Sequence, residues 1–536
     1  MPKCMVAYEL NTNRLVHTEY SSWPKEPPFS MASNSIIITY YASAAMGCFK
    51  KLGWPMPENI LDLYTEFRCL SNGNDPISGY SFFGALAAHG ITDTITAQIC
   101  CTSSSNNQNI FKKTEAKVMA LAELLSKMIS FIDLPRALWR GKYMKTIAEI
   151  EWNGIPIDVE KHELLKENWD NIKIQLIDKV DEKYGVYDGT TFKQDRFENW
   201  LKKNNIQWPR LSSGSLNLDG ETFRLMALVH PKLAPLRELR ETLSALRTNK
   251  LAVGSDGRNR CDLVPFRSKT GRNQPSSSRF IFGLSTWYRS LIKPKEGYGL
   301  AYIDWEQQEF GIAAALSQDE KMIEAYNTHD PYLAFAKQCG AVPLEATKQT
   351  HPKEREIYKT CVLAVQYGMG EQSLAKNISR SVAEAQLLLE QHRATYKKFW
   401  EWSNDSLDFA LLNGHLKTAL GWKIQVKEPV NERSLRNFPM QANGAEIFRL
   451  ACILATEGKI KICAPVHDAL LIEAPLAKLK HDIEKTKEYM QQAGEKILNG
   501  FKLRADVKET HYPDRYQDKR GIDMWNLINQ FLSKGK

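Results

Sequence analysis

The sequence lacks the cysteine and histidine spacings from which common zinc sites are built. Its ten cysteines include no CxxC pair, and its eleven histidines include no HxxxH or HExxH pattern. We interpret the cysteines as mostly buried, reduced thiols. Any catalytic metal ion is therefore expected to be held by carboxylates.

The sequence also lacks a long apolar run. No stretch approaches the roughly 20 apolar residues that cross a membrane. The opening MPKCMVAYEL has no charged region followed by a sustained apolar core. We expect a cytoplasmic protein with no membrane partner.

The chain is long and has a net positive charge. Its 536 residues are too many for one hydrophobic core, so roughly two to four packed units are expected. Lys and Arg number 71 against 62 Asp and Glu, a formal net charge of +9. This excess favours a polyanion such as nucleic acid as a partner, without establishing one.

Hydrophobic patterns predict several secondary-structure elements. Residues 6–20 alternate as strands do, and residues 114–128 have helical periodicity. A short apolar strand is predicted at 298–304, with a helix directly after it at 309–326. A strand that runs into a helix is thus predicted at Asp304.

The C-terminal half contains three further patterns. Helices are predicted at 354–370, where glycines follow the apolar run, and at 444–458. Residues 461–475 contain two apolar strand candidates that flank a tight turn at His467 and Asp468. This pattern indicates a hairpin with a carboxylate at its tip.

Asp304 and Asp468 are the carboxylates that we interpret as metal ligands. Each follows an apolar strand-like run, where a carboxylate is costly to desolvate unless a cation or water compensates it. Phosphoryl transfer with two metal ions needs at least two carboxylates that face one another from rigid elements. Taken singly, each is also explained as a turn or helix-cap aspartate.

A helical stripe with a cationic and an aromatic end is a third element. Arg355, Lys359, Leu363 and Tyr367 recur every four residues and line one face of the predicted helix. The stripe matches the polarity of a nucleotide, with the triphosphate at the cations and the sugar and base near the other end. An amphipathic helix with solvated cations would have the same spacing.

Three segments together resemble the family A DNA polymerases of bacteria and bacteriophages. DWEQQEFGIAAALS at 304–317 resembles the motif that begins with a metal-binding Asp. REIYKTCVLAVQYG at 355–368 is similar to the helix that grips the incoming nucleotide, and PVHDALLIE at 465–473 is similar to the hairpin with the second Asp. Supporting segments lie in the family's order, at 270–276, 328–336 and 433–448, and the resemblance extends from about 140 to the C-terminus.

The resemblance implies a template-directed DNA polymerase that adds deoxynucleotides to a primer 3′ end by two-metal-ion phosphoryl transfer. Asp304, Asp468 and the backbone carbonyl of Trp305 would hold two Mg²⁺ ions, with Mn²⁺ as a substitute. Lys359 would also donate a proton to the leaving group. The implied partners are primer-template DNA and deoxynucleoside triphosphates. We expect a monomer, leave open a processivity partner, and expect the cytosol of a bacterial host if a phage encodes the chain.

The resemblance assigns the other site residues by position. Glu309 and Tyr367 would close the space beside the sugar's 2′ position and so exclude ribonucleotides. The nucleotide-binding set would be Arg355, Lys359, Leu363, Tyr367, Glu309, His329 and Gln307. The residues that contact primer-template DNA would be Arg272, Arg433, Asn437, Gln441 and His467.

Three residues depart from the family pattern. Leu363 occupies a position that is usually aromatic, Ala469 replaces a carboxylate that often follows the second metal-binding Asp, and Gly311 replaces a basic residue. We expect activity to survive these departures, with altered fidelity.

The N-terminal region weakly resembles a proofreading 3′-5′ exonuclease whose acids are depleted. Glu9 and Asn11 occupy positions of an Asp-x-Glu strand, Ala45 and Glu115 fall where further acids belong, and Asp62 is a weak candidate. Without convergent carboxylates two metal ions cannot be held. We therefore predict a structural remnant that does not proofread.

These observations predict an α+β multidomain protein with a right-hand polymerase architecture. A palm with an antiparallel sheet would carry helical fingers and a thumb, after an N-terminal α/β ribonuclease H-like exonuclease remnant. The predicted domains are 1–134 for the exonuclease-like domain, 135–265 for the thumb and the lead-in to the polymerase region, 266–318 and 420–536 for the palm, and 319–419 for the fingers.

Two alternatives stay open. A 3′-5′ nuclease acting through the N-terminal domain would require intact acids where the chain has Asn11 and Ala45. A non-enzymatic DNA-binding protein derived from a polymerase would be expected to have lost Asp304, Lys359 or Asp468, and all three are present.

Overall fold

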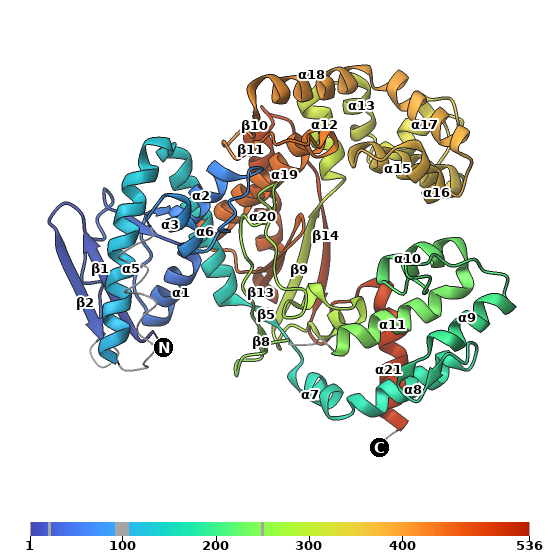
Figure 1. Cartoon of the computed structure of the whole chain (residues 1–536), viewed down its shortest axis with the longest axis horizontal. Coiled ribbons are helices and arrows are strands. Elements are labelled where there is room, and N and C mark those ends of the chain that lie inside the picture. The colour runs from blue at the N-terminus through green and yellow to red at the C-terminus, as the bar shows by residue number, and fades with distance from the viewer. Residues whose placement is uncertain (1, 20–22, 92–106, 248–250, 535–536) are drawn as a thin grey trace.

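The structure is a computed structural model that describes residues 2–19, 23–91, 107–247 and 251–534. Figure 1 shows a central sheet, an N-terminal unit on one side of it, and two groups of helices on the other. No helix within these ranges is both long enough and apolar enough to cross a membrane.

The central sheet is antiparallel, with the strand order β12-β13-β9-β14. Segments from three distant parts of the chain therefore lie side by side. The strands are β9 (Tyr298–Trp305), β12 (Ile462–Val466), β13 (Ala469–Pro475) and β14 (Ala505–His511).

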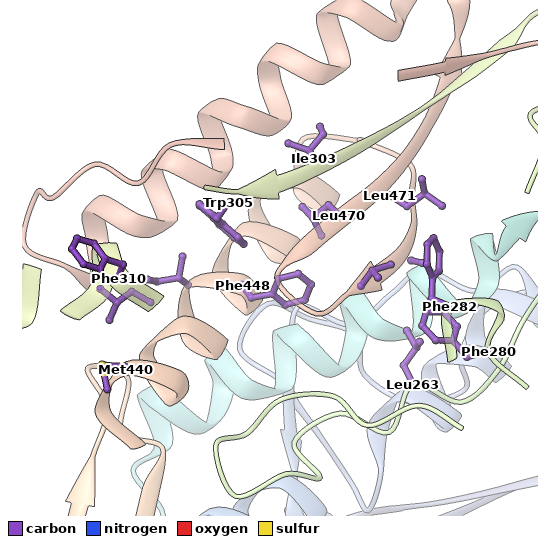
Figure 2. Close-up of a cluster of buried hydrophobic side chains, with 14 of the residues drawn as sticks. Leu263, Phe280, Phe282, Ile303, Trp305, Phe310, Met440, Phe448, Leu470 and Leu471 are labelled. Atoms are coloured by element: carbon purple, nitrogen blue, oxygen red, sulfur yellow. The ribbon is translucent and has the colours of Figure 1, made fainter. Parts of the chain in front are cut away.

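Alternation along β9 explains how the sheet is packed. Ala301, Ile303 and Trp305 are at most 3% exposed, whereas Tyr302 and Asp304 on the other face are half-buried. A strand with one face on the core has this period of two. Figure 2 shows the labelled side chains of Ile303, Trp305, Leu470 and Phe448 in the buried cluster beside the sheet.

Two long helices, α19 (Glu432–Glu457) and α20 (Leu476–Ile497), pack against each other beside the sheet. The prediction placed the start of the first near residue 444, which is wrong because the helix begins at Glu432 and continues through Pro439. An interior proline removes one i→i−4 hydrogen bond and usually ends or kinks a helix, so the apolar pattern alone did not predict that the helix continues through Pro439.

The predicted passage from strand to helix at Asp304 is confirmed. The predicted single helix at 309–326 is wrong, because it is divided into α12 (Gln308–Ser317) and α13 (Glu320–Asn327). Gln318 between them has a φ of 55°, and the Asp319 side chain caps α13 by accepting from Met322 N.

Two helical groups lie on the same side of the sheet in Figure 1. The upper one continues from α13 through α14 (Pro331–Gln338), α15 (Pro352–Gln366), α16 (Glu371–Ile378), α17 (Val382–Thr395) and α18 (Lys397–Asn413). The lower one contains α7 (Val159–Glu167), α8 (Trp169–Asp181), α9 (Gln194–Lys203), α10 (Gly220–Val229), α11 (Ala234–Arg247) and α21 (Ile522–Lys534).

The N-terminal unit holds two separate two-stranded sheets among its described residues. The alternating run predicted at 6–20 is extended but not continuous: within the described residues it forms an antiparallel pair, β1 (Cys4–Glu9) with β2 (Arg14–Glu19), joined by a turn. The second pair, β3 (Ile36–Thr39) with β4 (Asn59–Asp62), is parallel. These pairs do not confirm a single ribonuclease H-like sheet. The helices are α1 (Ala42–Leu52), α2 (Leu63–Ser71), α3 (Phe82–Ala88), α5 (Asn107–Met128) and α6 (Leu134–Asn153), which leads to the rest of the chain.

Candidate active site

Asp304 lies near the end of β9, between two neighbouring strands. Ala469 of β13 is opposite it on one side and Asp506 of β14 on the other. Its Oδ1 atom is buried and has no hydrogen-bond partner in the described part of the chain. Burial, followed by the charges of Asp468 and Asp506, raises the pKa of Asp304 to about 7.

Asp468 lies in the tight turn between β12 and β13, as predicted from the hairpin pattern. His467 allows this turn by adopting a φ of 58°. Because Ala469 is opposite Asp304, the hairpin brings both acids to one edge of the sheet. Burial is the main cause of the raised pKa of Asp468, and the charges of Arg272 and His467 oppose it.

Residues expected to surround the sugar also come together here. Glu309, in the first turn of α12, accepts a 2.8 Å hydrogen bond from Arg272 Nη2. Burial, then the charge of Glu309, raises the pKa of Tyr367 at the end of α15. Arg433 Nε donates to the Tyr367 carbonyl. Four predicted site residues therefore form one connected group.

The cationic end of the α15 stripe is paired with acids. Arg355 Nε lies 2.5 Å from Asp330 Oδ2, and Lys359 Nζ lies 3.2 Å from Glu356 Oε1. The guanidinium of Arg355 also lies 5.6 Å from the ring centre of Tyr332. A nucleotide phosphate would have to compete with these carboxylates.

His329 precedes Asp330, the partner of Arg355, and Leu363 belongs to the stripe itself. His329 has a φ of 67° and a 72% exposed side chain, whose Nδ1 is 3.8 Å from Glu306 Oε2. Leu363 is half-buried on α15, between the cations and Tyr367. Gln307 precedes α12 with a φ of 45°, and its Oε1 is buried without a partner among the described residues.

A pocket of about 280 Å³ lies beside Asp468. Arg272, His467 and Asp468 line it, together with Gln308 and Phe448. Gln308 is 3% exposed and its Nε2 has no partner in the described ranges. No sequence signal indicated Gln308, because its neighbours form an ordinary helical run.

The α19 helix presents the remaining predicted DNA contacts. Arg433, Asn437 and Gln441 recur every four residues, so they share one face of α19. Arg433 is exposed, and the other two are half-buried.

Packing accounts for one of the departures from the family pattern. A Cβ at Gly311 would lie 2.6 Å from Leu503 Cδ2 and 3.0 Å from Tyr326. A side chain at position 311 would therefore require Leu503 to move and Tyr326 to shift slightly. Ala469 is fully buried, and Trp305, whose carbonyl was a predicted metal ligand, is buried against Phe448 with ring centres 6.3 Å apart.

Two acids of the N-terminal unit have partners of their own. Asp62 is 1% exposed and accepts hydrogen bonds from the backbone amides of Tyr41, Ala42 and Tyr64. Glu9 binds Arg14 at 3.0 Å. Within the described residues, no group of three or more Cys, His, Asp or Glu side chains is suited to hold a metal ion.

Comparisons with known proteins agree with this geometry. Residues 265–511 match the model of DNA polymerase family A. The DNA polymerase I of Aquifex aeolicus is 24% identical over 396 residues, which are 70% of this chain and 67% of that protein. The thermostable DNA polymerase I of Thermus thermophilus is 25% identical over 50% of this chain and only 31% of its own length. That relative therefore extends well beyond the matched part.

A solved structure has the same fold. The POL domain of Pol1 from M. smegmatis, in complex with DNA primer-template and dNTP, has a TM-score of 0.76 and 20% sequence identity. The similarity covers 95% of this chain and 92% of that domain.

Proposed function

We propose that this chain, whose residues 265–511 belong to DNA polymerase family A, is a template-directed DNA polymerase that extends a primer with deoxynucleotides. The observation that carries the proposal is the pair Asp304 and Asp468 at one sheet edge, beside the connected group of Arg272, Glu309 and Tyr367.

The residues present fit divalent metal ions. Asp304 Oδ1 is buried without a partner, and the pKa values of both acids are raised by burial. A hard cation would supply the missing partner and favour the charged carboxylates. Asp304, Asp468 and the Trp305 carbonyl would hold two Mg²⁺ ions, or Mn²⁺ in their place. Bound there, the ions would make the primer 3′-hydroxyl more acidic and neutralise phosphate charge.

The incoming nucleotide would lie along α15. The triphosphate would be bound by Arg355, Lys359 and His329. It would first displace Asp330 from Arg355 and Glu356 from Lys359. Lys359 would deliver a proton to the departing pyrophosphate. Gln307 and Leu363 would contact the nucleotide between the metal-binding acids and Tyr367.

Sugar selection would depend on Glu309 and Tyr367. The 2.8 Å bond from Arg272 fixes Glu309, so the carboxylate would resist displacement by a ribose 2′-hydroxyl. Primer-template DNA would be contacted through its minor groove, where polar donors can test base-pair shape. The contacting residues would be Arg272, Arg433, Asn437, Gln441 and His467. Binding would be independent of sequence and sensitive to salt.

The arrangement of elements supports a right-hand architecture. We assign the palm to 266–318 and 420–536, the fingers to 319–419, the thumb with the preceding lead-in to 135–265, and a degenerate exonuclease-like domain to 1–134. We propose a monomer.

The N-terminal unit would not proofread. Asp62, a weak candidate for a metal ligand, accepts hydrogen bonds from backbone amides, and Asn11 and Ala45 carry no charge. Purified protein should not shorten a primer 3′ end in Mg²⁺ or Mn²⁺. Shortening that is lost on Glu9→Ala would contradict this assignment.

Primer extension tests the proposed function. The purified chain is given a labelled primer on a DNA template, with deoxynucleotides or ribonucleotides, and the product is sequenced. We expect a product that follows the template and forms efficiently only with deoxynucleotides. A protein that binds the DNA with no extension, or with extension that ignores the template, would overturn the proposal.

A further inference from the structure

We propose that the N-terminal unit is a brace that positions Arg272 at the primer end, acting through Arg68 and Asn72. The inference rests on the proposed function and extends it to a unit without a catalytic role. Both residues are positioning residues, because they act on the backbone of the segment that precedes Arg272.

The segment before Arg272 has an unfavourable backbone conformation. Val264 has a φ of 43° and Phe266 a φ of 58°, in the left-handed region that β-branched and bulky residues avoid. Such conformations persist only where surrounding contacts hold them. Contacts from outside the segment must therefore stabilise its backbone conformation.

The N-terminal unit provides contacts that hold it. Arg68 on α2 is 6% exposed; its Nε donates to the Phe266 carbonyl at 2.7 Å, and its Nη2 donates to the Arg267 carbonyl. Asn72, which is fully buried, donates from Nδ2 to the Lys269 carbonyl at 2.7 Å. Two side chains thus bind three carbonyls of one short segment.

The polymerase region also binds carbonyls of this segment. Trp422 Nε1 donates to the Lys269 carbonyl at 2.9 Å, and Arg449 Nη1 donates to the Gly271 carbonyl at 2.7 Å. A Cβ at Gly271, where φ is 76°, would lie 3.1 Å from both Trp422 and Arg449. The segment is therefore clamped jointly by donors of the N-terminal unit and of the polymerase region.

Arg272 comes directly after this clamp and points to the site. Its backbone amide donates to Ser268 Oγ at 2.8 Å, and its Nη2 binds Glu309. Without the donors of Arg68, the strained segment would relax and Arg272 would lose its fixed position. Primer-template binding would weaken, although no N-terminal residue contacts the DNA in this account.

A double-mutant cycle on primer-template affinity tests the brace. The dissociation constant is measured by fluorescence anisotropy, without nucleotide, for the full chain and for Arg68→Met, Arg272→Met and the double variant. We expect Arg68→Met to raise the dissociation constant about tenfold in the parental chain. In the Arg272→Met background it should have almost no further effect.

The matched control is Lys50→Met. Lys50 on α1 forms a 2.6 Å ion pair with Glu149 on α6, and neither residue is among the donors to the clamped segment. We expect this variant to bind like the parent. Equal effects of Arg68→Met in both backgrounds, or an equal effect of Lys50→Met, would overturn the brace.

Two further variants keep the test decisive if Arg68→Met does not fold. Arg68→Lys keeps the charge with a single donor group, and Asn72→Ala removes one contact, so each should give a smaller loss of affinity. Parental affinity in both would overturn the proposal. The cycle measures binding and needs no catalysis. If the chain does not extend a primer on a template but the effects of Arg68→Met and Arg272→Met on affinity are still coupled, the polymerase function is rejected and the brace is supported.

Discussion

Asp506 on β14 lies directly opposite Asp304 on β9 in the antiparallel register of the central sheet. Opposed residues of antiparallel strands point to the same face. Asp506 therefore places a second negative charge near Asp304, on the side away from Asp468. Burial and the charge of Asp468 are the larger causes of the raised pKa of Asp304, and Asp506 adds to them.

Replacing Asp506 should shift the pH dependence of catalysis. Asp506→Asn removes a negative neighbour, so the charged form of Asp304 becomes easier to form and its pKa falls. The acidic limb of the pH–rate profile should then move to lower pH. Single-turnover extension rates between pH 5 and 8 measure this shift.

Glu509→Gln is the control for Asp506→Asn. Glu509 lies on the same strand but opposite Ala301, so the change in net charge is the same at a greater distance from Asp304. An identical shift in both variants, or a shift to higher pH in Asp506→Asn, would contradict this relationship.

Lys359→Met should act mainly on the chemical step. Loss of the proton donor and of a phosphate contact should lower kcat by about 100-fold. Steady-state extension with varied nucleotide concentration provides the measurement. Lys353→Met, an exposed lysine on the same helix, should behave like the parent. A similar loss of kcat in both variants would show that the loss comes from removing any positive charge on α15, and not from removing a proton donor.

Glu309→Ala should relax the selection of the sugar. The variant opens the space beside the 2′ position, so the ratio of deoxynucleotide to ribonucleotide kcat/KM should fall by at least about tenfold. Competitive incorporation at one template position gives this ratio. Glu324→Ala, an exposed acid on α13, should leave it unchanged. An unchanged ratio in Glu309→Ala would remove Glu309 from sugar selection.

His392 should make the stability of the protein depend on pH. Burial lowers the pKa of His392 from 6.5 to about 3, and its Nδ1 accepts a 3.1 Å bond from Trp400 Nε1. The unfolded state therefore binds one more proton between these values, and stability falls as the pH is lowered through 6.5. The expected slope is about 1.4 kcal/mol per pH unit at most.

Chemical denaturation of the parent and of His392→Phe at several pH values below 7 checks this slope. The variant is expected to be less stable overall, yet it should lack this part of the pH dependence. His481→Gln, an exposed histidine on α20, should keep the parental slope. Equal slopes in His392→Phe and the parent would contradict the role of His392.

Strong local patterns predicted the elements that carry the site. The apolar run before Asp304 and the hairpin around Asp468 appear as β9 and as β12 with β13. Strand alternation and turn chemistry are local, and a single sequence contains them. The helical spacing of 355–367 indicated Leu363, whereas the positions of His329 and of the DNA-contact set came from the family resemblance. The roles of all these residues stay predictions.

Long-range packing accounts for what the sequence did not predict. The pairing of β14 with β9 brings Asp506 to Asp304 across 202 positions of sequence separation (506 − 304), and no local pattern indicates this register. The division of the 309–326 helix depends on one left-handed residue, Gln318. Asp330, the acidic partner of Arg355, comes from outside α15 and depends on long-range placement, whereas Glu356 and Lys359 are an i,i+3 pair on the helix itself.

The most direct test of the central claim is the single-turnover primer-extension rate of Asp468→Asn in Mg²⁺, with primer-template affinity measured on the same preparation. The variant keeps the shape of the side chain and removes its charge. We predict parental DNA binding and a rate lower by about three orders of magnitude, or about 4 kcal/mol of transition-state stabilisation. Extension at the parental rate by a folded, DNA-binding Asp468→Asn protein would contradict the account.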